Sequence, residues 1–281
     1  MATRDWIGTD SGNEGDWSVA ANWSGATVPI TGDIARFLTG SQSVVAGKDQ
    51  SGVNLLELIV TSGYSGDIGS STGKMEIGAT TLSFQGRGNA WFDVSTGSFN
   101  YDAVYVQGGV SGRRLYITGN VAAAHIMEGF VTFESGTVTE AWLETIGTQL
   151  EVPQVTITDA DFTTLHVLSG VVTQNGSGTI SALHILAGTV TSQEGTTTNV
   201  TMRGGLFVKN SPTTVASLKM YKGSCDASQD DRAKTFIDIE THVGMMLNLQ
   251  NAPDNVVVTN PIKIVGGRDN IKARTLSTTG I

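Results

Sequence analysis

Apolar and polar positions alternate along most of the chain in short segments that end at glycine. In four of these segments an apolar–polar–apolar triplet precedes the glycine, and the four glycines follow one another at nearly equal intervals. Side chains of a strand alternate between its two faces, so the outer residues of each triplet are expected inside and the middle one outside. The four triplets are 165–167 with Gly170, 183–185 with Gly188, 200–202 with Gly205, and 218–220 with Gly223.

A nearly fixed period of this kind indicates one strand-and-turn unit stacked on itself. Glycine is expected at the corner because the backbone there needs a positive φ or a close approach to the next coil. The predicted fold is therefore all-β, a single-stranded parallel β-helix (solenoid) with about 17–18 residues per coil. Leu165, Val167, Leu183, Ile185, Val200, Met202, Leu218 and Met220 are predicted inside. Looser copies are 58–60 with Gly63, 82–84 with Gly86, 92–94 with Gly97, 104–106 with Gly109, and 124–126 with Gly129.

The first 37 residues carry three of the five tryptophans and no glycine-closed triplet. The end of a solenoid presents an open strand edge and an uncovered core, and large aromatic side chains can cover both. The chain is therefore divided into an N-terminal aromatic cap or docking segment at 1–37, a β-helix at 38–265 and a C-terminal tail at 266–281.

The cap segment also carries a recognisable motif. Its elements are Trp6-Ile7-Gly8, Gly15-Asp16-Trp17, Ala21-Asn22-Trp23-Ser24-Gly25, Pro29, Gly32-Asp33 and Ala35-Arg36-Phe37. This pattern resembles the W-x-G…G-x-W…NWS-G…P…GD-x-A-x-F opening of autotransporter-like and extracellular β-helix passengers, which is also met in phage structural proteins. The resemblance implies that a β-helix starts here and implies almost nothing about chemistry.

Charge and composition exclude several classes of function. The formal net charge of −9 opposes binding to nucleic acid or to an anionic membrane surface. No apolar run approaches the roughly 20 residues that cross a bilayer, and the first residues show no apolar secretory segment. A single cysteine, Cys225, excludes an internal disulfide framework. Cys225 aligns with Val172, Val190 and Phe207, which predicts a buried thiol.

Three histidines share the middle position of their triplets. His125, His166 and His184 are followed in this frame by Thr201 and Lys219, and all should point outward. Outward histidines on neighbouring coils can bind a metal, but no cysteine or carboxylate keeps a fixed place beside them. A solvated polar stripe and a metal site, shared between subunits, are the two interpretations.

The next position of the frame holds Met127, Leu168, Leu186, Arg203 and Tyr221. Either the chain bends there and turns these side chains inside, or they form an apolar strip that marks a partner surface. Tryptophan is enriched at interface hot spots, although the cap tryptophans can also simply plug the core. The candidate interface residues are Trp6, Trp17, Trp23, Met127, Leu168, Leu186 and Tyr221.

Polysaccharide-cleaving β-helices use clustered outward carboxylates. The acidic pairs available are Asp159 with Asp161, Glu144 with Glu151, and Asp230 with Asp231, and none falls on consecutive coils of the frame. These residues are interpreted as loop carboxylates. No catalytic, cofactor-binding or metal-binding residue is assigned, and the chain is expected not to be an enzyme.

The expected function is that of a non-enzymatic virion structural protein, a capsid decoration (cement) protein of a tailed phage that binds and stabilises the head. The expected assembly is a homotrimer on the capsid surface, made in the host cytoplasm, with the major capsid protein as partner and no contact with nucleic acid or membrane. The alternatives are a tailspike or tail-fibre receptor-binding module and a β-helical surface adhesin, with a polysaccharide-degrading enzyme behind both.

Overall fold

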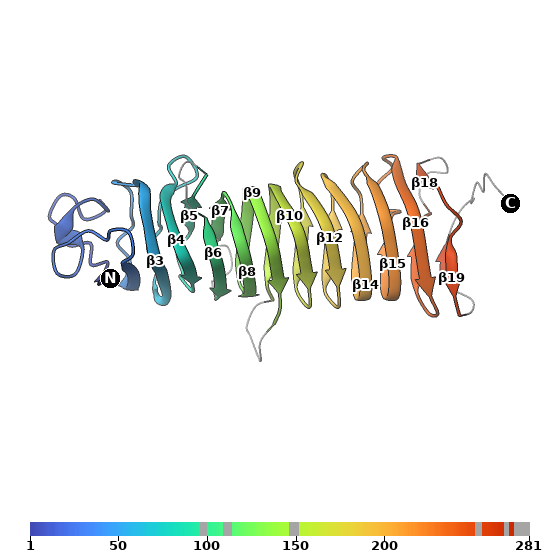
Figure 1. Ribbon diagram of the computed structural model, residues 1–281, viewed down its shortest axis with the longest axis horizontal. Helices are drawn as coiled ribbons and strands as arrows, with labels where there is room; N and C mark the ends of the chain where they lie inside the picture. The colour runs from blue at the N-terminus through green and yellow to red at the C-terminus, as the bar shows by residue number, and fades with distance from the viewer. Residues whose placement is uncertain (96–99, 109–113, 146–151, 251–254, 267–269, 273–281) are drawn as a thin grey trace. The chain divides into compact units, whose positions relative to one another are not determined.

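The computed structural model describes residues 1–95, 100–108, 114–145, 152–250, 255–266 and 270–272, and its strands appear in Figure 1. These residues fold as an all-β parallel solenoid of about 10 turns with almost no helix, which confirms the predicted fold class. Contacts divide the chain into two compact units: unit 1 holds Met1–Thr139 with Ile146–Gln154, and unit 2 holds Glu140–Thr145 with Val155–Ile281. Each unit is described by itself.

Unit 1 contains two parallel ladders of strands. Ladder A stacks the residues Phe37, Val60, Phe84, Val106 and Ile126 in register, and all five side chains are buried. Ladder B is formed by a different strand segment of the same coils. The strands of this unit are β1 (Thr3–Asp5), β2 (Ile34–Gly40), β3 (Asp49–Tyr64), β4 (Met75–Phe84), β5 (Ala90–Asp93), β6 (Tyr101–Gln107), β7 (Leu115–Thr118), β8 (Val121–Glu128) and β9 (Phe130–Leu143), whose last residues belong to unit 2.

Ladder B of unit 1 explains one departure from the sequence frame. Met75, Phe92, Ile117 and Phe133 stack in register there and are buried. The triplet 92–94 therefore belongs to the second ladder and not to the ladder of the other triplets. Periodicity alone could not separate the two, because both ladders alternate in the same way. Gly97 and Gly109, the glycines assigned to triplets 92–94 and 104–106, lie outside the described residues.

Unit 2 repeats the same plan with tighter coils. Its ladder A stacks Leu165, Leu183, Val200, Leu218 and Ile239. Its ladder B stacks Val172, Val190, Phe207, Cys225 and Leu247. The strands are β10 (Gln154–Val167), β11 (Val171–Gln174), β12 (Thr179–Ile185), β13 (Thr189–Ser192), β14 (Thr196–Lys209), β15 (Thr214–Asp226), β16 (Lys234–His242), β17 (Met246–Asn248), β18 (Val256–Val258), β19 (Lys263–Val265) and β20 (Asn270–Lys272).

The predicted interior of unit 2 is confirmed. All eight residues named from the triplets are buried, and so is Cys225 at the predicted place in ladder B. Burial raises the pKa of the Cys225 thiol to about 12, so the group stays an inert thiol at neutral pH. Strand β20 pairs with β17, so the ladder continues past residue 265, where the predicted tail begins; residues 273–281 lie outside the described ones.

Coil length differs between the units. Three steps of ladder A in unit 2 are short and nearly equal; they join Leu165 to Leu183, Leu183 to Val200 and Val200 to Leu218. The next step of that ladder, from Leu218 to Ile239, is longer. Every step of ladder A in unit 1 is also longer, from Phe37 through Val60, Phe84 and Val106 to Ile126. The predicted period thus holds for three steps of ladder A in unit 2, whereas the steps of ladder A in unit 1 are longer. Ladder B of unit 1 also has short steps, from Met75 to Phe92 and from Ile117 to Phe133.

Glycine occupies the corners of the tight coils because the backbone there has a positive φ and because the neighbouring coil approaches closely. Gly170, Gly188, Gly205 and Gly223 all have positive φ, between 69° and 103°. They also stack on one another: a Cβ on Gly188 would lie 2.4 Å from the carbonyl oxygen of Gly170, and one on Gly205 would lie 2.5 Å from that of Gly188. A side chain at these corners would meet both the backbone strain of the left-handed region and a steric clash.

The aromatic cap of unit 1 covers the first strands of ladder A. Trp6, Trp17 and Trp23 are buried and pack on Phe37, with ring centroids 5.7–5.9 Å from it. Trp23 Nε1 donates a hydrogen bond to the Trp17 carbonyl at 2.8 Å. The cap therefore fills the end of the core with large rings whose polar atoms are mostly satisfied.

The polar residues of the N-terminal motif hold the cap loops. Asn22 Nδ2 donates to the carbonyl oxygens of Asn13 and Asp16 at 2.6 and 3.0 Å. Ser24 Oγ accepts the backbone N–H of Asp5, and Asp33 Oδ1 accepts that of Ala2. The motif is thus explained by loop closure around the buried rings.

Candidate interaction surfaces

The three tryptophans proposed as contacts have almost no exposed surface. Trp6 is 4% exposed, Trp17 is fully buried and Trp23 is 1% exposed. Their rings pack against each other, with centroids 5.1 Å apart for Trp6–Trp23 and 4.4 Å for Trp17–Trp23. The rings are thus covered by the cap itself, and an interface role for the tryptophans stays a prediction.

Aliphatic side chains are exposed on the outside of the cap. Ile7 is 46% exposed and Val45 is 64% exposed. Both flank the loop around Gln42: Gly8, the neighbour of Ile7, lies against the Gln42 side chain, and Gly15 lies against both Gln42 and Val45. This pair was not predicted from the sequence, because isolated aliphatic residues in loops carry no periodic signal.

The predicted apolar strip forms in unit 2 and not at Met127. Leu168, Leu186 and Tyr221 are exposed at the turn that follows ladder A, whereas Met127 in unit 1 is buried. A register shift between Val106 and Gln107, where β6 pairs with β8, turns Met127 inward as an extra residue. Its sulfur accepts a hydrogen bond from Gln107 Nε2 at 3.2 Å.

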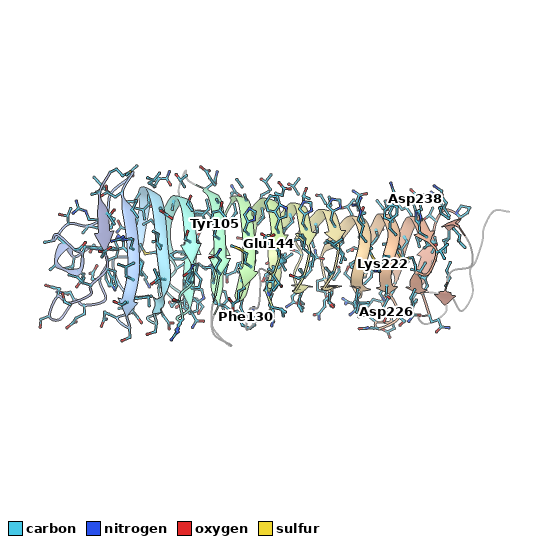
Figure 2. The ribbon with its side chains drawn as sticks, turned by 90° about the horizontal axis from the view of Figure 1, so that it is seen from below. Tyr105, Phe130, Glu144, Lys222, Asp226 and Asp238 are labelled. Carbon is cyan, nitrogen blue, oxygen red and sulfur yellow. The ribbon has the colours of Figure 1, made fainter. Side chains whose placement is uncertain are left out.

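The outward histidines form ring stacks. In unit 2, His166 stacks on Trp142 at 5.6 Å and on His184 at 5.0 Å, with interplanar angles of 8° and 17°. In unit 1, His125 stacks on Tyr105 (labelled in Figure 2) at 5.3 Å. Stacked imidazoles direct their nitrogen lone pairs along parallel planes, which is poor geometry for binding one metal ion. Among the described residues no group of three or more metal-ligating side chains comes together.

The stacked histidines of unit 2 interact electrostatically with neighbouring side chains. His166 Nε2 lies 3.0 Å from Glu140 Oε1, which holds the ring in place. Partial burial is the largest cause that lowers the pKa of His184, and electrostatic interactions with His166 and Arg203 lower it further. His184 is therefore uncharged at neutral pH, and the stack behaves as an aromatic surface there.

The carboxylates considered for catalysis hold loops. Asp159 Oδ1 accepts hydrogen bonds from the backbone and hydroxyl of Ser177 at 2.9 and 2.8 Å, and Asp161 Oδ1 accepts the N–H of Thr179 at 2.7 Å. The bonds from Ser177 lower the pKa of Asp159. Of the other pairs, Asp230 is bound by Arg232 at 2.9 Å, and Glu151 lies outside the described residues.

A buried polar corner in unit 2 was not predicted. Gln174, Ser192 and Lys209 stack in register at the end of ladder B, and all three are fully buried. Lys209 Nζ donates to the hydroxyls of Ser211 and Thr213. Burial lowers the pKa of Lys209 to about 7, and no carboxylate of the described residues forms an ion pair with its ammonium group to oppose that shift.

A second lysine lies one coil further on. Lys234 is buried, and its Nζ donates to the carbonyl oxygens of Asp230 and Arg232 at 2.5 and 2.9 Å. Its pKa is also lowered by burial, although the Asp230 carboxylate 3.5 Å away opposes this shift. The corner thus contains two amines on successive coils, which function as hydrogen-bond donors inside the solenoid.

Unit 1 contains a polar cavity of about 450 Å³ beside ladder B. Lys48, Lys74, Asp49, Glu76 and Asp93 line it together with residues 71–73. Lys74 Nζ is already bound to Glu134 Oε2 at 2.8 Å and to Thr118 Oγ1 at 2.6 Å, and Asp93 accepts both the N–H and the hydroxyl of Ser95. Much of the charge in the cavity is therefore committed to neighbouring strands and loops.

No helix in the described part of the chain has the length and hydropathy of a membrane span. Comparison with known proteins finds no matching family model, no matching curated protein and no matching solved structure.

Proposed function

We propose that the chain is a non-enzymatic structural protein of a phage virion, a decoration protein that is made in the host cytoplasm, binds the major capsid protein and stabilises the capsid from its surface. The cap of unit 1 is the capsid-binding end, and the protein assembles as a homotrimer. The N-terminal motif, with its resemblance to the opening of phage and extracellular β-helices, is the basis for this assignment of class.

The exposed aliphatic pair on the cap supports the docking role. Ile7 and Val45 present apolar surface on both sides of the Gln42 loop, and two aromatic side chains hold that loop: Trp6 Nε1 donates to the Gln42 carbonyl at 3.2 Å, and Tyr64 Oη does so at 2.5 Å. Rigid, exposed apolar groups are favourable contact points, because binding them costs little conformational entropy.

The roles of the acidic side chains support a non-enzymatic protein. A glycoside hydrolase needs two carboxyl groups that face a common substrate. Asp159 and Asp161 instead accept hydrogen bonds from the turn of the next coil. Their negative charge is used to fix loop conformation.

The ring stacks favour capsid decoration over recognition of a carbohydrate receptor. Sugar rings pack on the open faces of aromatic side chains, and a stacked neighbour covers one of those faces. Trp91 stacks on Tyr116 at 5.0 Å and 5°, and His166 is stacked between Trp142 and His184. These stacks reduce the aromatic face area that is open to a sugar.

Binding to virion heads tests the docking proposal. The double variant Ile7→Ser/Val45→Ser should lose co-sedimentation with heads depleted of this protein while its melting temperature stays close to that of the wild type. Ile264→Ser, which changes an aliphatic side chain of unit 2 that is 48% exposed, is the matched control and should bind normally. Full binding by the double variant would overturn docking through the cap.

Copy number tests the virion assignment separately. Virions purified on a density gradient from cells that make the protein should contain it in a fixed ratio to the major capsid protein, as measured by quantitative mass spectrometry. The low ratio of a tail component would favour the receptor-binding alternative. Absence from purified virions would overturn the proposal.

A further inference from the structure

Unit 2 has a basic edge where each coil leaves ladder A. The basic edge is defined here as Leu168, Leu186, Arg203, Tyr221 and Lys222, and all five side chains are exposed. Arg203 and Lys222 are partners in register on neighbouring strands, so two positive charges lie side by side. Figure 2 labels Lys222 on this unit.

The two cations of the basic edge differ from Arg232 and Lys263, two basic residues of unit 2 that have carboxylate partners. Arg232 is paired with Glu194 and Asp230, and Lys263 is paired with Glu240. Within the described residues, neither Arg203 nor Lys222 takes part in an ion pair. Their mutual repulsion is therefore uncompensated in a chain whose net charge is −9.

The same unit has an acidic edge where each coil enters ladder A. The acidic edge is defined as Asp159, Asp161, Glu194 and Asp231, and these side chains are exposed. Asp161 accepts a hydrogen bond from Thr179, which pairs with Thr196 where the strands of ladder A begin. Glu194 precedes Thr196 by two residues. Arg232 is paired with Glu194 at this edge, and the remaining carboxylates leave an excess of negative charge. Unit 2 thus has a negative excess at one end of the strands of one ladder and a positive excess at the other.

We propose that the basic edge of unit 2 binds the acidic edge of unit 2 on a second copy of the chain. Arg203 and Lys222 would gain carboxylate partners, and Leu186 and Tyr221 would lose exposed apolar surface. An acidic edge on the same unit is the observation that favours a second copy over other anionic partners. Such a contact joins two different surfaces, so it closes into a ring when the rotation between copies permits.

This inference deepens the self-assembly part of the proposed function by naming its surface. Sedimentation velocity of the full chain over a range of protein concentrations is the test. The wild type should associate, with weaker association at high ionic strength because salt screens exposed charges. Arg203→Glu/Lys222→Glu should weaken association by about tenfold or more.

A charge-swap mixture makes the test specific. Gln193→Lys/Asp231→Lys places two lysines on the acidic edge, one in place of the Asp231 carboxylate and one beside Glu194, and should also weaken self-association. Mixing this variant with Arg203→Glu/Lys222→Glu should restore part of the association between the two variants, because the new lysines give the new glutamates partners of opposite charge. Lys48→Glu/Arg87→Glu in unit 1 matches the change in net charge and should associate like the wild type.

The outcomes separate this inference from capsid binding. A wild type that is monomeric at every concentration would overturn it, as would association that the edge variants leave unchanged or that the unit 1 control weakens equally. Failure of the mixture to associate would also overturn it. Co-sedimentation with heads is scored independently, so a monomer that still binds heads would leave the docking proposal standing.

Discussion

The cap of unit 1 and the polar corner of unit 2 bury large side chains in opposite ways. The cap fills its end of the core with tryptophan rings, whose apolar surface favours burial. The corner buries the amines of Lys209 and Lys234, which favour water. Equal burial therefore has opposite effects on stability: the cap stabilises the fold, whereas the corner lowers its stability by an amount that depends on pH.

Removing a ring from the cap should produce the largest effect. Trp23→Ala should lower the free energy of unfolding by about 3–5 kcal/mol, because it leaves a cavity between Trp6, Trp17 and Phe37. Denaturant unfolding followed by tryptophan fluorescence and circular dichroism measures this loss. A change below about 1 kcal/mol would show that the cap is not coupled to the core.

Replacing a lysine of the corner should have the opposite sign. Lys209→Met should raise the free energy of unfolding by about 1–4 kcal/mol near neutral pH, because an apolar side chain of similar length replaces a buried amine without an acidic partner. Urea unfolding of the two proteins at about pH 6 measures the difference.

The stabilisation by Lys209→Met should disappear as pH rises. The folded-state pKa of Lys209 is lowered to about 7 from 10.5, so between these values the unfolded chain binds more protons and wild-type stability increases with pH. The penalty is complete below about pH 7 and is gone by about pH 10.5. A difference between the two proteins that does not change over this interval would contradict the assignment.

Replacing glycine by alanine compares a turn of each unit, and the expected changes in stability are smaller. Gly188→Ala in unit 2 combines a φ of 82° with a clash against the Gly170 carbonyl, whereas Gly32→Ala in unit 1 has a φ of 84° and open space around its Cβ. We expect a loss of about 1–3 kcal/mol for the strain at either site and a further loss at Gly188 alone. Equal melting temperatures for the two variants would contradict the stacked-corner interpretation.

The smallest effect is expected at the histidine stack. His184→Gln should change stability by less than about 1 kcal/mol, the usual range for cross-strand pairs. The pKa of His184 is lowered in the folded protein, so the wild type should lose slightly more stability than the variant as pH falls through the histidine range. Thermal melts at matched pH values measure this. A steeper loss for the variant would contradict the direction of the shift.

Much of the fold could be predicted because the interior of a solenoid repeats. Leu165, Leu183, Val200 and Leu218 occupy one column, and their period alone identified it. Met127 could not be placed correctly, because a single register shift moves one residue from outside to inside and leaves no trace in composition. The longer coils of unit 1 blurred the period in the same way.

The position of the polar corner could have been predicted from the sequence, but the burial of its lysine could not. Gln174, Ser192 and Lys209 recur at the inward position two residues after Val172, Val190 and Phe207. A lysine there is read as solvated by default, since lysine is almost never fully buried. The structure shows that neighbouring hydroxyls supply its hydrogen bonds, and hydroxyl side chains are too common in this chain to signal that role.

The column of stacked glycines has a consequence for how such a chain can change in evolution. Gly170, Gly188 and Gly205 place each tight coil directly over the one before it, and the strands between them stay in register. Losing one residue from a coil would exchange its inward and outward side chains, whereas losing or duplicating a whole coil would leave its neighbours matched. A gene of this kind therefore lengthens or shortens most easily by whole coils, and its history should be visible as differences in coil number between descendants.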